Sequence, residues 1–242
     1  MNLKAIIRNT LMFLRIDLSK NLQYDRLTHL ILKKVIQKDS NCIDVGCHKG
    51  EILNDFIHLA PKGKHFAFEP IPYMFENLEK KFEGKAKIFP FALSNEKGES
   101  TFQVVKNAPA YSGLKNRRYS DIKNPEIEQI KVEINKLDDI ISKETRIDLI
   151  KIDVEGGEFD VIRGGIELIK RDKPIIIFEC GVGSSDFYGV SAKDFYELIT
   201  KEIGLKIYTL KSFAKSKKPL NEKEFEYFFQ TNKEYYFVAS SK

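Results

Sequence analysis

The sequence predicts an α/β fold with a mostly parallel, seven-stranded sheet that carries helices on both faces. Three observations lead to this prediction. Short apolar runs alternate with segments of helical periodicity, a single helix separates successive runs, and several runs end in glycine or acidic residues. Strands joined by single helices pair in parallel through right-handed crossovers. With 242 residues, of which 42% are hydrophobic and 31% charged, the chain is long enough for one such domain with a buried core.

The first half of the chain follows a β-α-β-α-β order. Helical spacing alternates with apolar runs that are typical of buried parallel strands, and proline or glycine residues end the helices. The predicted elements are a helix over 24–37, a strand over 41–46, a helix over 51–60, a strand over 64–70, a helix over 73–82 and a strand over 87–94.

The segment 95–135 interrupts this alternation. It is rich in Gly, Pro, Asn and Ser, and we interpret it as an insertion near the ligand edge, with a mobile loop over 108–125. Two strands are possible inside it, over 100–106 and 129–135. The alternation then resumes with strands over 146–156, 173–180, 205–210 and 234–240, helices over 158–170 and 192–203, and a loop with a helical turn over 212–228.

Composition limits the classes of function. The formal net charge of +5 suits an anionic ligand or an acidic surface, but it does not indicate nucleic acid as a partner. No run of about 18 apolar residues indicates a transmembrane helix. The three cysteines, Cys42, Cys47 and Cys180, have neither a disulfide framework nor zinc-site spacing, so we expect them to be ordinary packing residues.

The N-terminal 40 residues are predicted to form a separate helical segment. Arg8 and Arg15 interrupt its first apolar stretch, and no cleavage site follows, so a signal peptide is not expected. Its amphipathic pattern permits packing on the domain or in a homodimer. Because nothing indicates export, we expect a cytoplasmic location.

The turn after the first strand is the first candidate binding element. Asp44, Gly46, His48 and Gly50 lie in DVGCHKG, where glycines permit a tight turn and the following helix offers unpaired N–H groups. A ligand with a carboxylate and an ammonium group, as in S-adenosylmethionine, fits such a site. The G-x-x-x-G spacing lacks the second close glycine of the dinucleotide fingerprint, which weighs against an NAD-dependent oxidoreductase, the alternative reading.

Two later strand ends extend this candidate site. Glu69, at the end of the second predicted strand and followed by Pro70, is placed to accept hydrogen bonds from ribose hydroxyls. Ala92 and Leu93, at the end of the third, offer an apolar slot for an adenine ring. Either strand end taken alone is also compatible with ordinary surface or core packing.

Three acidic residues lie at the ends of two further strands. Asp153 and Glu155 follow the strand that begins at 146, and Glu179 ends the next strand along the chain. Because ligands bind at the carboxyl ends of such strands, we expect these carboxylates to converge as candidate catalytic residues. A divalent cation such as Mg²⁺ is possible there but not favoured, and no metal ligands are assigned.

These motifs, taken in order, resemble the FkbM family of methyltransferases. The matching residues are IDVGCHKG, FAFEPIP, FALS and above all DLIKIDVEGGEFDVIRGG followed by IIIFE, so the resemblance covers roughly 41–182. It implies a Rossmann-like class I methyltransferase domain, here 41–242, with S-adenosylmethionine as donor and the hydroxyl of a sugar, glycan or natural product as acceptor. It also implies that Asp44, Gly46 and Gly50 lie on the methionine side of the donor, and that Glu69 binds its ribose.

Other residues remain open in function. His48 and Lys49 depart from the family's usual turn, and His48 and Asp153 are further candidate donor contacts. In the insertion, Tyr111 and the Arg117–Tyr119 segment are candidates for recognising the acceptor. The basic stretch Lys211–Lys218 leaves a nucleic-acid methyltransferase as another alternative, although we do not expect nucleic acid as a partner.

Overall fold

The computed structural model describes residues 19–119 and 122–242. Within them, seven strands form one sheet in the order β3-β2-β1-β7-β8-β10-β9, and three form a smaller sheet in the order β4-β6-β5. The strands are β1 (Cys42–Val45), β2 (His65–Phe68), β3 (Lys87–Phe89), β4 (Ala92–Leu93), β5 (Gly98–Val105), β6 (Ile127–Asn135), β7 (Leu149–Ile152), β8 (Ile175–Glu179), β9 (Lys206–Thr209) and β10 (Tyr236–Ser240).

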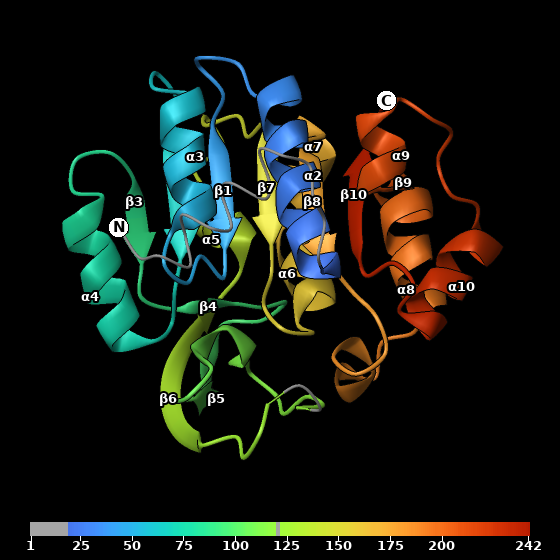
Figure 1. Cartoon of the computed structure of the whole chain (residues 1–242). Coiled ribbons are helices and arrows are strands. Elements are labelled where there is room, and N and C mark those ends of the chain that lie inside the picture. The colour runs from blue at the N-terminus through green and yellow to red at the C-terminus, as the bar shows by residue number, and fades with distance from the viewer. Residues whose placement is uncertain (1–18, 120–121) are drawn as a thin grey trace.

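The seven-stranded, mostly parallel sheet confirms the predicted fold class. Strands β3, β2, β1, β7 and β8 pair in parallel, while β10 inserts antiparallel between β8 and β9. In Figure 1 the small sheet lies below the ends of the parallel strands, on the side to which the β7 arrow points. The predicted insertion therefore faces the carboxyl edge of the main sheet, where open α/β sheets bind ligands.

Helices cover both faces of this sheet (Figure 1). The α-helices are α2 (Lys20–Val35), α3 (Glu51–Leu59), α4 (Pro72–Lys81), α5 (Leu137–Ile140), α6 (Glu158–Gly164), α7 (Ile166–Asp172), α8 (Ala192–Tyr196), α9 (Leu210–Ala214) and α10 (Glu222–Thr231). Short 3₁₀ turns span Pro109–Tyr111 and Ser185–Tyr188, and a π-helical stretch, Glu197–Glu202, continues α8.

Alternation along the strands builds two buried cores. On one face Ile43 and Val45 pack with side chains of α6, α7, α8 and α10. On the other face Cys42 and its neighbours pack with α2, α3 and α9. Cys42, Cys47 and Cys180 are all buried, as expected for packing residues. Successive strand residues point to opposite faces, so nearly continuous apolar strands supply both cores.

Three predicted elements differ from the structure. The strand over 87–94 is broken at Pro90, which lacks an N–H, so its second half joins the small sheet as β4. The helix over 158–170 divides into α6 and α7 at Gly165. The segment 212–228, expected to be mainly loop, contains most of the ten-residue α10, which begins with a capping box at Asn221 and buries Phe225 and Phe229.

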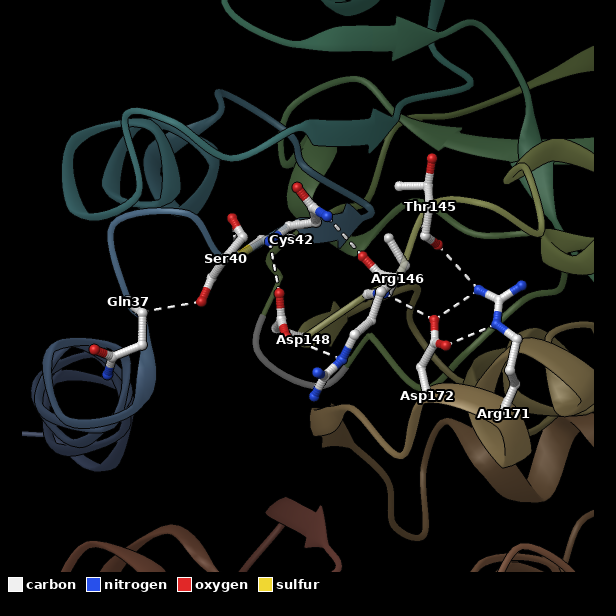
Figure 2. A network of polar contacts seen from close by, with 10 residues as sticks. Gln37, Ser40, Cys42, Thr145, Arg146, Asp148, Arg171 and Asp172 are labelled. Atoms are coloured by element: carbon white, nitrogen blue, oxygen red, sulfur yellow. Dashed lines mark hydrogen bonds and ion pairs between the residues drawn. The ribbon is translucent and has the colours of Figure 1, made fainter.

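Polar contacts join the strands at the opposite, amino edge of the sheet (Figure 2). The backbone N–H of Asn41 donates to Asp148 at 2.9 Å, and the Asn41 side chain donates to the carbonyl of Arg146. Asp172 accepts from the N–H of Ile147 at 2.8 Å and from Arg171. These bonds fix where β1 and β7 begin, and thereby how far both strands reach toward the other edge.

Residues 1–18 of the predicted N-terminal segment 1–40 lie outside the described residues, which include its remainder with α2. That helix follows the cap Ser19 and begins at Lys20, four residues before the predicted start, and it buries Leu27, Ile31 and Leu32 against the sheet. In residues 19–119 and 122–242, no helix combines the length and the apolar character needed to cross a membrane.

Candidate active site

The turn between β1 and α3 has an unusual backbone. Gly46, His48 and Gly50 all adopt left-handed φ angles, of 77°, 48° and 69°. Only glycine adopts this region without steric cost, so His48 is a strained position of the kind that clusters at functional sites. A Cβ on Gly46 would overlap the carbonyl oxygen of Asp153, and this close approach brings the ends of β1 and β7 together.

Gly46→Ala is therefore expected to destabilise the fold by about 2 kcal/mol or more, through the left-handed φ and the overlap with the Asp153 carbonyl. Thermal and urea unfolding would measure the change. Gly84→Ala is the matched control, because Gly84 has a φ of 70° but an added Cβ there meets nothing within 4 Å. Equal losses in the two variants would show that the approach to Asp153 contributes nothing.

Gly50 lies where α3 and α4 pack closely, and its contact with a cofactor stays a prediction. It is the N-cap of α3, and a Cβ there would come within 2.5 Å of Phe82 and 2.8 Å of Leu78. It is not among the lining residues of either cavity described below. Its position thus indicates packing between α3 and α4, and it does not support the predicted contact with a cofactor.

Asp44 carries a buried carboxylate at the end of β1. It is 3% exposed, and its Oδ2 has no hydrogen-bond partner among the described residues. Burial raises its pKa to about 7, although the charge of Lys151 acts in the opposite direction. An unpaired acceptor is costly to bury, so a cationic ligand group is the natural partner for this oxygen.

Glu69 connects two loops at the end of β2. Its Oε2 accepts from the backbone N–H of His48 at 3.0 Å, and its Oε1 accepts from that of Ile71 at 3.0 Å. Burial raises the pKa of this carboxyl to about 7, and the two backbone N–H donors counteract that effect. Each carboxylate oxygen has a second lone pair, so Glu69 retains acceptor capacity toward a ligand.

A small cavity of about 50 Å³ lies between the carboxyl edge of the main sheet and the small sheet. Glu69 and Pro70 lie at one end, and Ile71, Ala92 and Leu93 form an apolar wall. These are four of the predicted donor-side residues together with one neighbour. The structure thus brings the second and third strand ends together as predicted, with a hydrogen-bonding end beside an apolar slot.

A larger cavity of about 660 Å³ adjoins the small one. The two share the lining residues Gly46, His48, Ala110, Asp153 and Glu155. The larger cavity is also lined by aromatic and polar side chains of α2, the insertion and the chain around β10, including Asn21, Tyr24, Thr28, Tyr111, Asn232, Tyr235 and Tyr236.

Asp153 is the centre of a polar network on three adjacent strands. Its Oδ2 accepts from Lys151 Nζ at 2.8 Å and from the Tyr236 hydroxyl at 2.6 Å. Glu179 lies within hydrogen-bonding reach of both Asp153 and Tyr236. Lys151 Nζ also lies 5.2 Å from the centroid of the Tyr236 ring. The predicted meeting of Asp153 and Glu179 is thus present, with two partners that the sequence did not reveal.

The pKa values of Asp153 and Glu179 are shifted in opposite directions. Burial alone would raise the pKa of Asp153, but the charge and hydrogen bond of Lys151 and the Tyr236 hydroxyl hold it below its usual value. Burial, followed by the charge of Asp153, raises the pKa of Glu179 to about 8. The ionised form is therefore favoured at Asp153 and the protonated form at Glu179, an arrangement typical of acid–base sites.

Glu155 lines both cavities but points to a different partner. It forms an ion pair with Arg117 of the insertion, whose guanidinium lies 5.1 Å from the centroid of the Tyr111 ring. The backbone N–H of Arg118 also donates to the carbonyl of Gly183 at 2.9 Å. These contacts tie residues 117 and 118 of the insertion to the carboxyl edge of the main sheet, and the charge of Glu155 is neutralised by Arg117.

Glu158 is a further residue that sequence reasoning did not select. It is fully buried at the start of α6, and its Oε1 accepts from the backbone N–H groups of Val154 and Gly156 at 3.0 and 3.1 Å. These bonds fold the loop that carries Asp153 and Glu155. An acidic residue in the first turn of a helix was the available signal, but it is common at surface helices as well.

His48 lines both cavities, and its pKa is lowered by burial and then by the charge of Lys49. Within the described part of the chain, no group of three or more His, Cys, Asp or Glu side chains is arranged to hold a metal ion. Asp153 is engaged with Lys151, Glu155 with Arg117, and Glu69 with two backbone donors.

Known proteins resemble this chain in sequence and in fold. A model of the methyltransferase FkbM domain matches residues 44–204. The 2-O-methyltransferase NoeI of Sinorhizobium fredii is 27% identical over 164 residues, which are 60% of this chain and 65% of that protein, so the match spans slightly less than two thirds of the relative. The solved structure of methyltransferase FkbM from Methylobacillus flagellatus has a TM-score of 0.52 at 14% identity, over 84% of this chain and 44% of that one.

The structural likeness supports the class I methyltransferase fold that the sheet order indicates. The family predicted from the DVGCHKG and IKIDVEG motifs is confirmed by the domain match. That match includes every predicted site residue from Asp44 to Glu179 and extends over more than half of the chain, and the protein therefore belongs to the methyltransferase FkbM domain family.

Proposed function

We propose that the protein transfers a methyl group from S-adenosylmethionine to a hydroxyl of a sugar or glycan. The observation that carries the donor assignment is the unpaired Oδ2 of Asp44, buried beside the glycine turn. S-adenosylmethionine supplies an activated methyl group on a sulfonium sulfur, and its ammonium group would give that oxygen a charged hydrogen-bond partner.

The remaining donor-side residues fit the same ligand. Glu69 has acceptor capacity for ribose hydroxyls, and Ile71, Ala92 and Leu93 offer a flat apolar wall for an adenine ring. The turn at Gly46 allows a close approach of backbone to the ligand. The alternative, an NAD-dependent oxidoreductase, would have to bind a pyrophosphate at this turn. The turn lacks the second close glycine with which the usual fingerprint approaches a pyrophosphate.

The larger cavity supports a saccharide as acceptor. Its rings of Tyr24, Tyr111 and Tyr235 stand among amide and hydroxyl groups such as Asn21 and Thr28. Sugars combine apolar ring faces with hydroxyl groups, and tyrosine offers an apolar face with a polar end. The resemblance to a 2-O-methyltransferase is consistent with transfer to oxygen.

Asp153 is the proposed general base of this reaction. It lines both cavities, so it lies where donor and acceptor would meet, and it is ionised at neutral pH. It would accept the hydroxyl proton while the oxygen attacks the methyl carbon and the electron pair of the carbon–sulfur bond returns to sulfur. The protonated form is favoured at Glu179, and Glu155 is paired with Arg117, so both are weaker candidates for this role.

Isothermal titration with S-adenosylmethionine tests the donor assignment. We expect measurable binding to the wild-type protein and a loss of about tenfold or more in Glu69→Ala, because a charged acceptor is removed. Glu69→Gln is the intermediate variant, since its single amide oxygen can accept from only one of the His48 and Ile71 N–H groups, and thermal unfolding would check that the loop is preserved. Binding of NAD with no heat from S-adenosylmethionine or S-adenosylhomocysteine would overturn the proposal.

A further inference from the structure

We propose that Tyr236 is a positioning residue that holds the Asp153 carboxylate oriented toward the cavity where the acceptor hydroxyl would bind. This inference rests on the proposed function and deepens it. Tyr236 is the first residue of β10, outside the stretch 44–204 that matches the family model, so no family motif assigns it a role.

The strand register places Tyr236 at this point. β10 pairs antiparallel with β8, and Tyr236 lies opposite Glu179. β8 in turn lies beside β7, which is followed directly by Asp153. The three side chains therefore come together from three consecutive strands of the sheet, at its carboxyl edge.

The hydrogen bonds at Asp153 define its orientation. The Tyr236 hydroxyl and Lys151 Nζ donate to the same oxygen, Oδ2, at 2.6 and 2.8 Å. Two donors on one oxygen restrict rotation of the carboxylate, and both favour its charged form. Lys151 is largely buried, with 7% of its side chain exposed, whereas the Asp153 side chain is 27% exposed and faces the cavities, so the donors lie behind a carboxylate that a ligand can reach.

The Tyr236 ring is itself held in place, which makes its hydroxyl a fixed donor. Its centroid lies 5.1 Å from that of the Tyr24 ring and 5.8 Å from that of the Tyr235 ring. Lys151 Nζ lies 5.2 Å from the centroid of the Tyr236 ring. Replacing tyrosine with phenylalanine would keep these ring contacts and remove only the hydroxyl. The hydroxyl can thus be tested separately from the packing.

The test is a carbon-13 NMR titration of aspartate carboxyls in the full chain, with Asp153→Asn used to assign the Asp153 signal. We expect Tyr236→Phe to raise the pKa of Asp153 by about one unit, because a donor to the charged form is lost. Lys151→Met should raise the pKa of Asp153 further, through loss of a charge. Tyr208→Phe, in β9, whose hydroxyl bonds to the carbonyl of Lys242, is the control that should leave the pKa of Asp153 unchanged.

Kinetics provide the second readout. A base works only when ionised, so kcat falls as the pH drops through the pKa of Asp153. Tyr236→Phe should move this acidic limb to higher pH by the same unit and leave the KM for S-adenosylmethionine unchanged. An unshifted Asp153 signal in a folded Tyr236→Phe protein overturns the inference. The titration needs neither donor nor acceptor, so it does not depend on the proposed methyl transfer. If the proposed function is wrong but this inference is right, the wild-type protein is inactive and Tyr236→Phe still raises the pKa of Asp153.

Discussion

Asp153→Asn is expected to lower kcat by about 10²–10⁴-fold, the usual contribution of a general base. The amide has nearly the same shape as the carboxylate and can still accept from Tyr236 and Lys151. It cannot take a proton from a hydroxyl at neutral pH. The loss should therefore fall on the transfer step, while the fold is preserved.

Glu155→Gln is the contrasting variant. Glu155 lies two residues further along and lines the same two cavities, but its charge is paired with Arg117. We expect its kcat to fall less than tenfold. Initial rates with methyl-labelled S-adenosylmethionine and a panel of oligosaccharide acceptors would measure both variants. A decrease of only a few-fold in each would remove the base role from this loop.

Donor binding must be followed in parallel, because Asp153 is also a candidate donor contact. Calorimetric titration of Asp153→Asn with S-adenosylmethionine separates the two roles. A base predicts that kcat decreases far more than the donor affinity does. Equal losses in affinity and in kcat/KM, with kcat unchanged, would instead assign Asp153 to donor binding alone.

Much of the main sheet could be predicted because its signals are local. Each parallel strand is a short apolar run next to a helix of clear periodicity, and the crossover rule then fixes the pairing. The strand ends at Asp44, Glu69 and Asp153 follow directly, since the carboxyl ends of parallel strands share one edge. Most of the site residues that were predicted from strand ends line one or both of the two cavities.

The elements that were not predicted depend on tertiary contacts. α10 is a short helix that follows a polar, basic stretch, and it is stabilised by the burial of Phe225 and Phe229 against the domain. Tyr236 enters the site only because β10 inserts antiparallel beside β8, which no local signal in 234–240 specifies. Gly50 shows that such a signal has two readings, because a glycine at a helix start suits either a ligand or a close helix, and Phe82 lies within 2.5 Å of the position of an added Cβ.

Asp44→Asn is the second variant with a large expected effect, this time on donor affinity. Truncating one partner of a buried charged hydrogen bond costs about 2–5 kcal/mol, so we expect S-adenosylmethionine to bind at least about 30-fold more weakly at pH 8. S-adenosylhomocysteine keeps the ammonium group but lacks the sulfonium charge. It should lose the same factor, because Asp44 is proposed to contact the ammonium.

The raised pKa of Asp44 also gives donor binding a pH dependence with a defined sign. Its pKa of about 7 in the free protein lies above its ordinary value, so the protonated form is favoured in the fold. The contribution of protonated Asp44 to the free energy of unfolding is therefore present at acidic pH and is lost as the pH rises through about 7. A cationic ligand favours the ionised form, so donor affinity should increase from pH 6 to pH 8, with release of a proton on binding below pH 7.

Titrations in two buffers of different ionisation enthalpy would count the released protons. Glu69 has a pKa of about 7 as well, but its proposed partners are neutral ribose hydroxyls, which provide little charge to drive its ionisation. Asp44→Asn should therefore lose most of the proton release, while Glu69→Gln should retain it. Undiminished affinity of Asp44→Asn at pH 8, with wild-type proton release, would mean that the ammonium binds elsewhere and that the unpaired Oδ2 serves another ligand group.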